Sequence, residues 1–271
     1  MPYDNDAGPL VLGASGKVGT MLRRLCDTGE VCFAAKPVFQ YRRGDQGLIW
    51  DVLHQPAPDV AFSSIIVLAG QTGHDDLGVN RDLALAACEL AAGAPVLLAS
   101  TQAVYGPQDG IMSETDTCAP VTAYGRAKLA MEQAVASHDN VTCLRIGNVV
   151  GCDGLAAGMA RGAVTLDQFT DGQFPQRAMI GPHSLCHALV ALLAHEQPLP
   201  QTLNLAQAPL VGMDAILNAA GAQWAPRPAP DGALARLEMD LTALRNLVDL
   251  PDADPHKMIA QARLAGWTPP Q

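Results

Sequence analysis

The sequence predicts an α/β fold, a doubly wound parallel sheet covered by helices on both faces, with a small C-terminal subdomain. Three observations lead to this prediction. Hydrophobic residues make up 49% of the 271-residue chain and aromatic residues only 4%, so the core must consist mainly of Ala, Val, Leu and Ile, as in parallel sheets packed between helices. Short apolar runs alternate with helical patterns up to about residue 150. Beyond that point the alternation weakens.

The first element is a short apolar run at 9–12, which ends in a glycine and leads into a helical pattern at 16–26. Within that pattern, apolar side chains recur at helical spacing. Further runs are candidates for buried strands, namely 38–41, 48–51, 64–69, 95–100, 141–146 and 202–205. Helical patterns lie between several of them, at 80–92 and 122–137. This order predicts a parallel sheet with helices on both sides.

The change in pattern near residue 150 predicts two structural units. We expect residues 8–150, with a return segment near 183–207, to form the sheet domain. We expect residues 151–182 and 208–271 to form a small subdomain that closes over the strand ends. Its segments 152–177 and 211–271 have the pattern of Gly/Ala-rich loops and short helices, and the three prolines within 225–232 predict a surface loop.

Charge and cysteine content restrict the class of protein. The formal net charge is 17 − 27 = −10, which argues against a nucleic-acid partner or an anionic membrane. No apolar run reaches the roughly 18 residues of a membrane-spanning helix, and the acidic N-terminal segment lacks the features of a signal peptide. Seven cysteines are scattered without a metal-ligand spacing. We therefore expect a cytoplasmic protein that acts on a small molecule and holds no metal.

A glycine-rich turn joins the first predicted strand to the first helix. Its residues are Gly13, Ala14, Ser15, Gly16, Lys17, Val18 and Gly19. Such a turn lets backbone N–H groups and the helix N-terminus approach a pyrophosphate, while the last glycine lets the helix lie close to the strand. The alternative is that the glycines serve only a tight turn that needs positive φ.

Tyr124 and Lys128 are four residues apart in a helical segment, so both side chains project from one face. An ammonium group beside a phenol favours the phenolate and brings the tyrosine toward the range of a proton-transfer group. The alternative is a surface pair that packs stem against ring. Gly125 argues against that alternative, because glycine inside a helix costs about 1 kcal/mol relative to alanine.

Thr101 directly follows the predicted strand at 95–100. Ligands of doubly wound sheets bind at the carboxyl ends of the strands, so a hydroxyl here would face a ligand. A turn hydroxyl bonded to the backbone is the equally ranked alternative.

Several motifs occur together in a characteristic order. They are GASGKVG at 13–19, VLAG at 67–70, Asn80 opening a helix, STQAVYG at 100–106, YGRAK at 124–128 and LRIGNVVG at 144–151. With these motifs the chain resembles the extended short-chain dehydrogenases, the NAD-dependent epimerase/dehydratase family. The resemblance covers almost the whole chain and is strongest from residue 10 to residue 151.

The resemblance implies a Rossmann domain that binds NAD(P) and a catalytic triad of Thr101, Tyr124 and Lys128. Thr101 would hold the substrate oxygen, Tyr124 would exchange the proton, and Lys128 would bond the nicotinamide ribose. Asn80 would support the site, with a helix N-cap as the alternative role. The implied cofactor-binding residues are Gly13, Ser15, Gly16, Lys17, Val18, Gly19, Leu68, Ala69, Gly70, Asn80, Tyr124 and Lys128.

The second predicted strand departs from the NAD-specific pattern, because no acid stands at its end before Asp45. The paired Arg42 and Arg43 suit a 2′-phosphate, so we expect NADP as the cofactor, with NAD as the alternative. Asp51 would lie on the adenine side.

For the substrate, the resemblance implies that Asn148 contacts a diphosphate and that Arg177 grips a nucleotide phosphate. A solvated surface arginine is the alternative for Arg177. The expected activity is hydride transfer at a carbinol or ketone carbon of a sugar nucleotide or similar polar substrate. Elimination of water is not expected, because the Asp-Glu pair of the 4,6-dehydratases is replaced by Gln102 and Ala103.

A non-catalytic NAD(P)-sensing regulator of the same fold is the alternative function. The complete set of Thr101, Tyr124 and Lys128 disfavours it, since a sensor needs no proton relay. The resemblance also implies a homodimer formed through the helices that carry Asn80 and Tyr124.

Overall fold

The computed structural model describes residues 3–44, 46–73, 76–108, 110–162 and 164–268. Its main body is a sheet of seven strands in the order β11-β7-β5-β4-β1-β2-β3, in which every neighbouring pair is parallel. The strands are β1 (Leu10–Leu12), β2 (Val38–Tyr41), β3 (Leu48–Ile49), β4 (Ile65–Val67), β5 (Val96–Thr101), β7 (Val141–Ile146) and β11 (Thr202–Leu205). The predicted doubly wound fold is confirmed, and each predicted strand overlaps an observed one.

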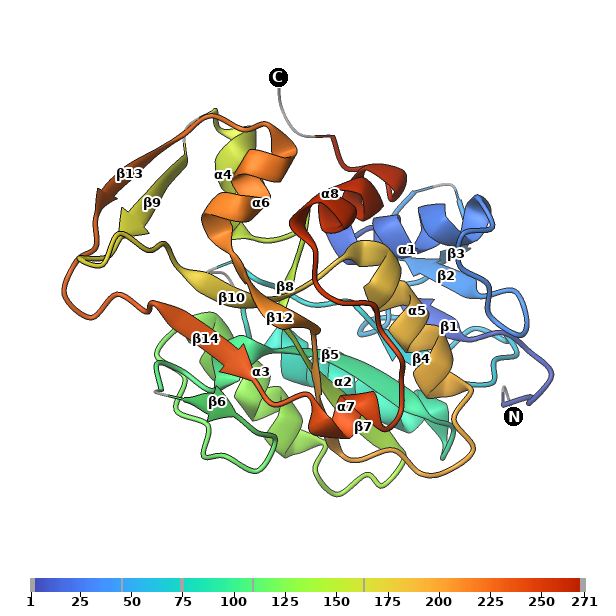
Figure 1. Ribbon diagram of the computed structural model, residues 1–271. Helices are drawn as coiled ribbons and strands as arrows, with labels where there is room; N and C mark the ends of the chain where they lie inside the picture. The colour runs from blue at the N-terminus through green and yellow to red at the C-terminus, as the bar shows by residue number, and fades with distance from the viewer. Residues whose placement is uncertain (1–2, 45, 74–75, 109, 163, 269–271) are drawn as a thin grey trace.

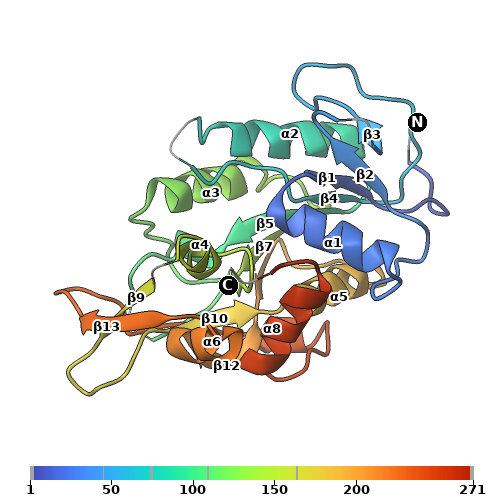
Figure 2. The same cartoon turned by 90° about the horizontal axis from the view of Figure 1, so that it is seen from above.

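Helices cover both faces of this sheet (Figures 1 and 2). On one face lie α2 (Val79–Ala91) and α3 (Ala123–Ala134), and on the other lie α1 (Lys17–Asp27) and α5 (Pro182–Leu193). Successive strand residues alternate between the two layers, so Leu10 and Leu12 pack toward α2 and α3 while Val11 packs toward α1 and α5. Burial on both faces explains why these strands are continuous apolar runs.

A second, mixed sheet lies beside the first and has the order β12-β10-β14-β6, with β8 also paired to β10. Its strands are β6 (Ile111–Met112), β8 (Asn148–Val149), β10 (Gln176–Ile180), β12 (Gln207–Gly212) and β14 (Arg236–Met239). Three helices, α4 (Gly154–Ala160), α6 (Met213–Ala220) and α8 (Pro255–Leu264), share a separate apolar cluster. The helices of the described residues also include the short η1 (Gln102–Val104) and α7 (Thr242–Arg245).

The expectation of loops and short helices after residue 150 is therefore wrong in part. β9 (Val164–Gln168) and β13 (Trp224–Pro228) form a two-stranded parallel arm that projects from the body (Figure 1). The prediction of a loop at 225–232 fails over its first half, which belongs to β13. The two strands of the arm are distant in sequence, so neither local pattern reveals the pairing.

Segments on both sides of the predicted boundary near residue 150 contribute strands to the second sheet. β6 and β8 lie within 8–150, yet they pair in the second sheet. α5 and β11 overlap the predicted return segment near 183–207; β11 belongs to the first sheet and α5 packs against it. No helix among the described residues is long and apolar enough to cross a membrane.

Candidate active site

The glycine turn connects β1 to α1 and lies against the loop that follows β4. Gly13 has a φ of 93°, and a Cβ on it would lie 2.5 Å from the Ala69 nitrogen. A Cβ on Gly19 would lie 2.3 Å from the Gly13 carbonyl oxygen, so only glycine lets α1 start so close to β1. Gly16 is the N-cap of α1, and no side chain in the described part of the chain caps this helix. The N-terminus of α1 is thus suited to an anion.

The remaining residues of the turn, Ser15, Lys17 and Val18, form its outer side. Ser15 and Lys17 are exposed, and Val18 is half-buried. The Lys17 ammonium donates to the Cys152 carbonyl at 3.5 Å, which links the turn to the segment after β8.

The loop after β4 comes close to α2 and α3. Leu68 and Ala69 both donate their N–H groups to the Leu12 carbonyl at 2.9 Å. A Cβ on Gly70 would lie 2.4 Å from Asn80 Oδ1 and 3.4 Å from Lys128 Nζ. The loop, α2 and α3 are therefore in close contact at the carboxyl end of β4.

Asn80 is buried and fixes this loop. Its Oδ1 accepts from the Gln71 N–H at 3.1 Å, and its Nδ2 donates to the carbonyls of Gln71 at 3.1 Å and Leu77 at 2.9 Å. The N-cap of α2 is Gly78, so the alternative role of Asn80 as N-cap is wrong.

Thr101, Tyr124 and Lys128 are brought together at the carboxyl end of β5. Burial raises the pKa of Tyr124, and a hydrogen bond with the Thr101 side chain opposes that rise. The Thr101 hydroxyl also accepts from the Ala103 N–H at 3.2 Å, so its predicted turn contact exists as well. Lys128 is 5% exposed and donates to the Ala99 carbonyl at 2.7 Å. Burial lowers the pKa of Lys128 to about 8.

Gly125 also has an explanation in the structure. A Cβ there would lie 2.5 Å from the Ala103 carbonyl oxygen, so α3 packs directly on the backbone that follows Thr101. The helix begins with Thr122 as N-cap, whose hydroxyl accepts from the Gly125 N–H at 3.0 Å.

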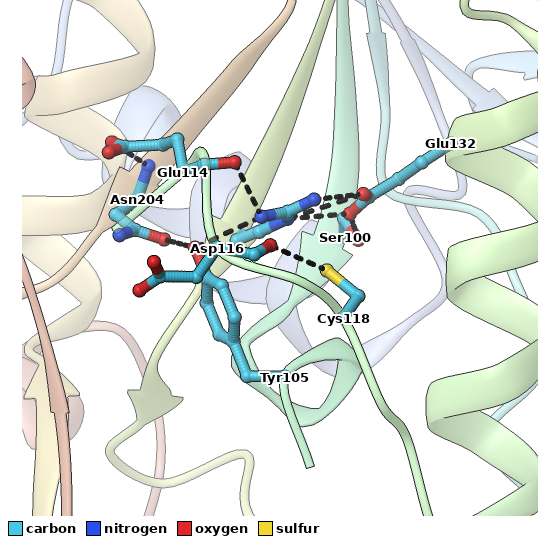
Figure 3. A network of polar contacts seen from close by, with 8 residues as sticks. Ser100, Tyr105, Glu114, Asp116, Cys118, Glu132 and Asn204 are labelled. Carbon is cyan, nitrogen blue, oxygen red and sulfur yellow. Dashed lines mark hydrogen bonds and ion pairs between the residues drawn. The ribbon is translucent and has the colours of Figure 1, made fainter. Parts of the chain in front are cut away.

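A buried polar network behind this site was not predicted from the sequence (Figure 3). Arg145 on β7 binds Glu132 on α3, with Nη2 and Oε2 2.8 Å apart and both side chains 7% exposed. The Ser100 hydroxyl donates to Glu132. Arg145 also donates to the Tyr105 hydroxyl at 3.1 Å. The available signal was a charged residue inside the apolar run at 141–146.

The predicted adenosine-side residues lie at the ends of β2 and β3. Arg42 Nε and Asp51 Oδ2 form an ion pair at 3.0 Å. The hydrogen bond with His54, followed by that with Arg42, holds the pKa of Asp51 at about 2. Arg43 is exposed, and Asp45 lies outside the described residues. The buried Gln40 accepts from the Gly13 N–H at 3.0 Å, which ties β2 to the glycine turn.

The two predicted substrate residues, Asn148 and Arg177, form hydrogen bonds with other residues of the protein. Asn148 Oδ1 accepts from Gln102 Nε2 at 2.6 Å, and Asn148 Nδ2 donates to Asp153 at 3.4 Å. Arg177 donates to the carbonyls of Gln176 at 2.8 Å and Leu234 at 2.9 Å. The alternative of a solvated Arg177 is therefore wrong, because its guanidinium ties β10 to the segment before β14. No group of three or more candidate metal ligands occurs within the described ranges.

Solved structures similar to this chain are enzymes of sugar-nucleotide chemistry. A UDP-glucose-4-epimerase from Stenotrophomonas maltophila with bound NAD is 21% identical with a TM-score of 0.76, covering 96% of this chain and 98% of its own. A UDP-glucuronic acid 4-epimerase from Bacillus cereus is 17% identical with a TM-score of 0.73, covering 95% and 98%. An NAD-dependent NDP-hexosamine 5,6-dehydratase of tunicamycin biosynthesis is 17% identical with a TM-score of 0.68, covering 95% and 97%.

At these identities the likeness establishes the shared fold. No curated protein sequence matches the chain. The family model described as RmlD substrate binding domain matches residues 9–163, which is more than half of the chain. The chain therefore belongs to the RmlD substrate binding domain family, in agreement with the extended short-chain dehydrogenase type that its motifs predicted.

Proposed function

We propose that this chain is an NAD(P)-dependent oxidoreductase or epimerase of the extended short-chain dehydrogenase type. Its reaction is hydride transfer at a carbinol or ketone carbon of a sugar nucleotide or similar polar substrate. The observation that carries the proposal is the contact of Tyr124 with Thr101, backed by the buried Lys128, beside the glycine turn. This arrangement joins a proton-transfer group to an anion-binding helix end.

The glycine turn suits a dinucleotide, because Gly13 and Gly19 let α1 begin close to the end of β1, and the N-terminus of α1 has no side-chain cap among the described residues. A bound nicotinamide dinucleotide supplies the hydride acceptor or donor. Thr101 orients the substrate oxygen, and Tyr124 gives a proton to that oxygen or removes one from it. The positive charge of Lys128 favours the phenolate of Tyr124 and so eases proton transfer.

We propose NADP as the preferred cofactor, with Arg42 and Arg43 on the 2′-phosphate. Both are exposed at the end of β2, and Arg42 is 62% exposed although it is paired with Asp51. A phosphate would compete with Asp51 for the Arg42 guanidinium. The similar structures name NAD, so NAD is the alternative for this chain.

Asn148 and Arg177 are proposed as contacts of a phosphorylated substrate. Asn148 is half-buried and lies next to Gln102, the residue after Thr101. Gln102 and Ala103 offer no ionisable group, so reduction, oxidation or epimerisation is proposed in place of 4,6-elimination.

The deciding experiment compares the unaltered protein with Tyr124→Phe on UDP-glucose and UDP-glucuronic acid, supplied with each oxidised dinucleotide. We expect turnover by the unaltered protein and a loss of about 10²- to 10⁴-fold in the variant, because the proton-transfer group is removed. Affinity for the dinucleotide should remain nearly unchanged. Near-normal turnover by Tyr124→Phe would reject the mechanism. Dinucleotide binding without turnover on any carbonyl or carbinol substrate would favour the regulator.

A homodimer through α2 and α3 is also proposed. These helices lie side by side on one outer face (Figure 2), and Val121, just before α3, is 64% exposed. Light scattering should give the mass of two chains, and Val121→Asp should lower it. A mass of one chain for the unaltered protein would contradict the dimer.

A further inference from the structure

Helix α3 and the end of β5 meet in a regular series of contacts. Along α3, Lys128 and Glu132 are one helical turn apart, and Tyr124 precedes them by the same spacing. Lys128 donates to the Ala99 carbonyl at 2.7 Å, and Glu132 accepts from the Ser100 hydroxyl. The turns that carry Lys128 and Glu132 therefore contact the two residues of β5 just before Thr101.

Arg145 holds Glu132 from the neighbouring strand. It lies opposite Ser100 in the β5–β7 register, so both contact the same carboxylate. Its Nε lies 3.2 Å and 3.3 Å from the two Glu132 oxygens, and its Nη2 lies 2.8 Å from one of them. Arg145 is itself fixed by the Tyr105 hydroxyl at 3.1 Å and the Glu114 carbonyl at 3.2 Å (Figure 3). The carboxylate therefore has one fixed position.

The ionisable groups around Lys128 come from two elements. Tyr124 and Glu132 are on α3, one turn before and one turn after Lys128, and Cys143 is on β7. Arg145, also on β7, reaches this region through its ion pair with Glu132. On the side of α2 the neighbour is the neutral Asn80, across Gly70. Burial lowers the pKa of Lys128, and Cys143 and Glu132 oppose this change. A buried thiol stays neutral because burial raises the pKa of Cys143 to about 12. The Glu132 carboxylate, which is ion-paired with Arg145, therefore acts on Lys128 in the direction that favours the ammonium form.

We propose that Glu132 is a positioning residue, which holds α3 against the end of β5 and supplies the negative charge that keeps the buried Lys128 an ammonium ion. Arg145 acts on Lys128 through Glu132, because it fixes the carboxylate and partly cancels its charge. The role assigned to Glu132 rests on the proposed function, in which Lys128 assists Tyr124.

The test follows the titration of Lys128 directly by the ¹³Cε signals of selectively labelled lysine in the full chain. The chain has four lysines, at positions 17, 36, 128 and 257, and a Lys128→Met sample identifies the signal. Glu132→Gln leaves Arg145 unopposed, so the Lys128 midpoint should fall by about one pH unit or more. Arg145→Met leaves Glu132 unopposed, so the midpoint should rise. Glu89→Gln removes the same charge from an exposed site on α2 and should change nothing.

The opposite signs separate a positioning role from loss of packing. If Glu132 and Arg145 had only a structural role, both variants would have a lower melting temperature. The Lys128 midpoint would then stay unchanged, or it would move in the same direction in both variants. Either result would overturn the proposal. If one variant does not fold, the sign of the other decides. The unaltered protein gives a third measurement, because a midpoint near the ordinary lysine value of about 10.4 would mean that no buried ammonium depends on Glu132.

This titration does not depend on turnover. Opposite shifts in a protein that converts no sugar nucleotide would support the role of Glu132 and reject the proposed function. Turnover with unchanged midpoints would do the reverse.

Discussion

Replacing Tyr105 by phenylalanine should destabilise the protein far more than the same change at Tyr3. Both hydroxyls donate to an asparagine Oδ1 at 2.6 Å, Tyr105 to Asn204 and Tyr3 to Asn5. Tyr105 and Asn204 are fully buried, whereas Tyr3 is 42% exposed. In Tyr105→Phe, Asn204 Oδ1 loses the donor it has among the described residues and Arg145 loses one acceptor. At Tyr3, water replaces the lost contact.

The magnitude follows from the number of groups left unpaired. An unsatisfied buried group costs about 1–3 kcal/mol, so Tyr105→Phe should lower the free energy of unfolding by roughly 2–3 kcal/mol. The melting temperature should fall by about 4–12 °C, whereas Tyr3→Phe should stay within about 0.5 kcal/mol of the unaltered protein. Urea unfolding of the three proteins measures the free energies, and thermal unfolding measures the melting temperatures. Equal stability of the two variants would refute the assignment of Tyr105 to a buried network.

Three further predictions concern the cofactor side of the site. Gly19→Ala should lose about 1–3 kcal/mol of stability and most of its dinucleotide affinity, because the new Cβ would lie 2.3 Å from the Gly13 carbonyl oxygen. Gly154→Ala is the control, because a Cβ there has no described atom within 4 Å, and equal behaviour of the two variants in urea unfolding and dinucleotide titration would contradict the prediction. Burial lowers the pKa of Lys128 from 10.5 to about 8, so the unfolded chain binds more protons between these values and stability rises with pH there. The stability of the unaltered protein relative to Lys128→Met should therefore be constant below about pH 7 and grow from pH 8 to 10.5 in urea unfolding, and a flat difference would disprove the shift. Arg42→Ala should weaken NADPH binding about tenfold or more and spare NADH, as fluorescence titration of both can show, and an equal loss for the two would remove Arg42 from the 2′-phosphate.

The central sheet could be predicted from the sequence because its strands are buried on both faces. Runs such as 65–67 and 96–98 are apolar at every position, and glycines or helical patterns separate them. The second sheet gave no such signal. Its strand β6 has two residues and β8 has two, and their partners β14 and β10 follow much later in the chain.

The prediction of a loop at 225–232 was wrong over β13 because it relied on the prolines. Pro226 and Pro228 lack the N–H group that a central strand needs. β13 is described with one neighbour, β9, and the Ala229 N–H donates to the Gln168 carbonyl at 2.9 Å. Along a strand the backbone N–H groups of residues two apart point the same way, so the N–H groups of the odd-numbered residues point toward β9. The proline nitrogens of Pro226 and Pro228 point away from β9, which an edge strand tolerates.

The spacing of Tyr124 and Lys128 predicted their roles, but it did not indicate a role for the Glu132 carboxylate one turn further along the helix. Glu132 looks like an ordinary exposed helix residue in the sequence, and only its burial against Arg145 gives it a role. Pairing of Arg42 with Asp51 was missed for the same reason, since each residue was assigned separately to the cofactor.

The step from β7 to β8 limits how this protein can change shape. Gly147 alone separates the two strands, and so it alone joins the two sheets at this point. Its N–H donates to the Leu205 carbonyl at 3.0 Å in the first sheet, and a Cβ on it would lie 2.6 Å from the Ala178 carbonyl oxygen in the second. A one-residue connection that is held by both sheets cannot act as a hinge, so we expect insertions at Gly147 to prevent folding. New substrate preferences would instead arise by lengthening exposed turns such as 170–173 at the tip of the arm.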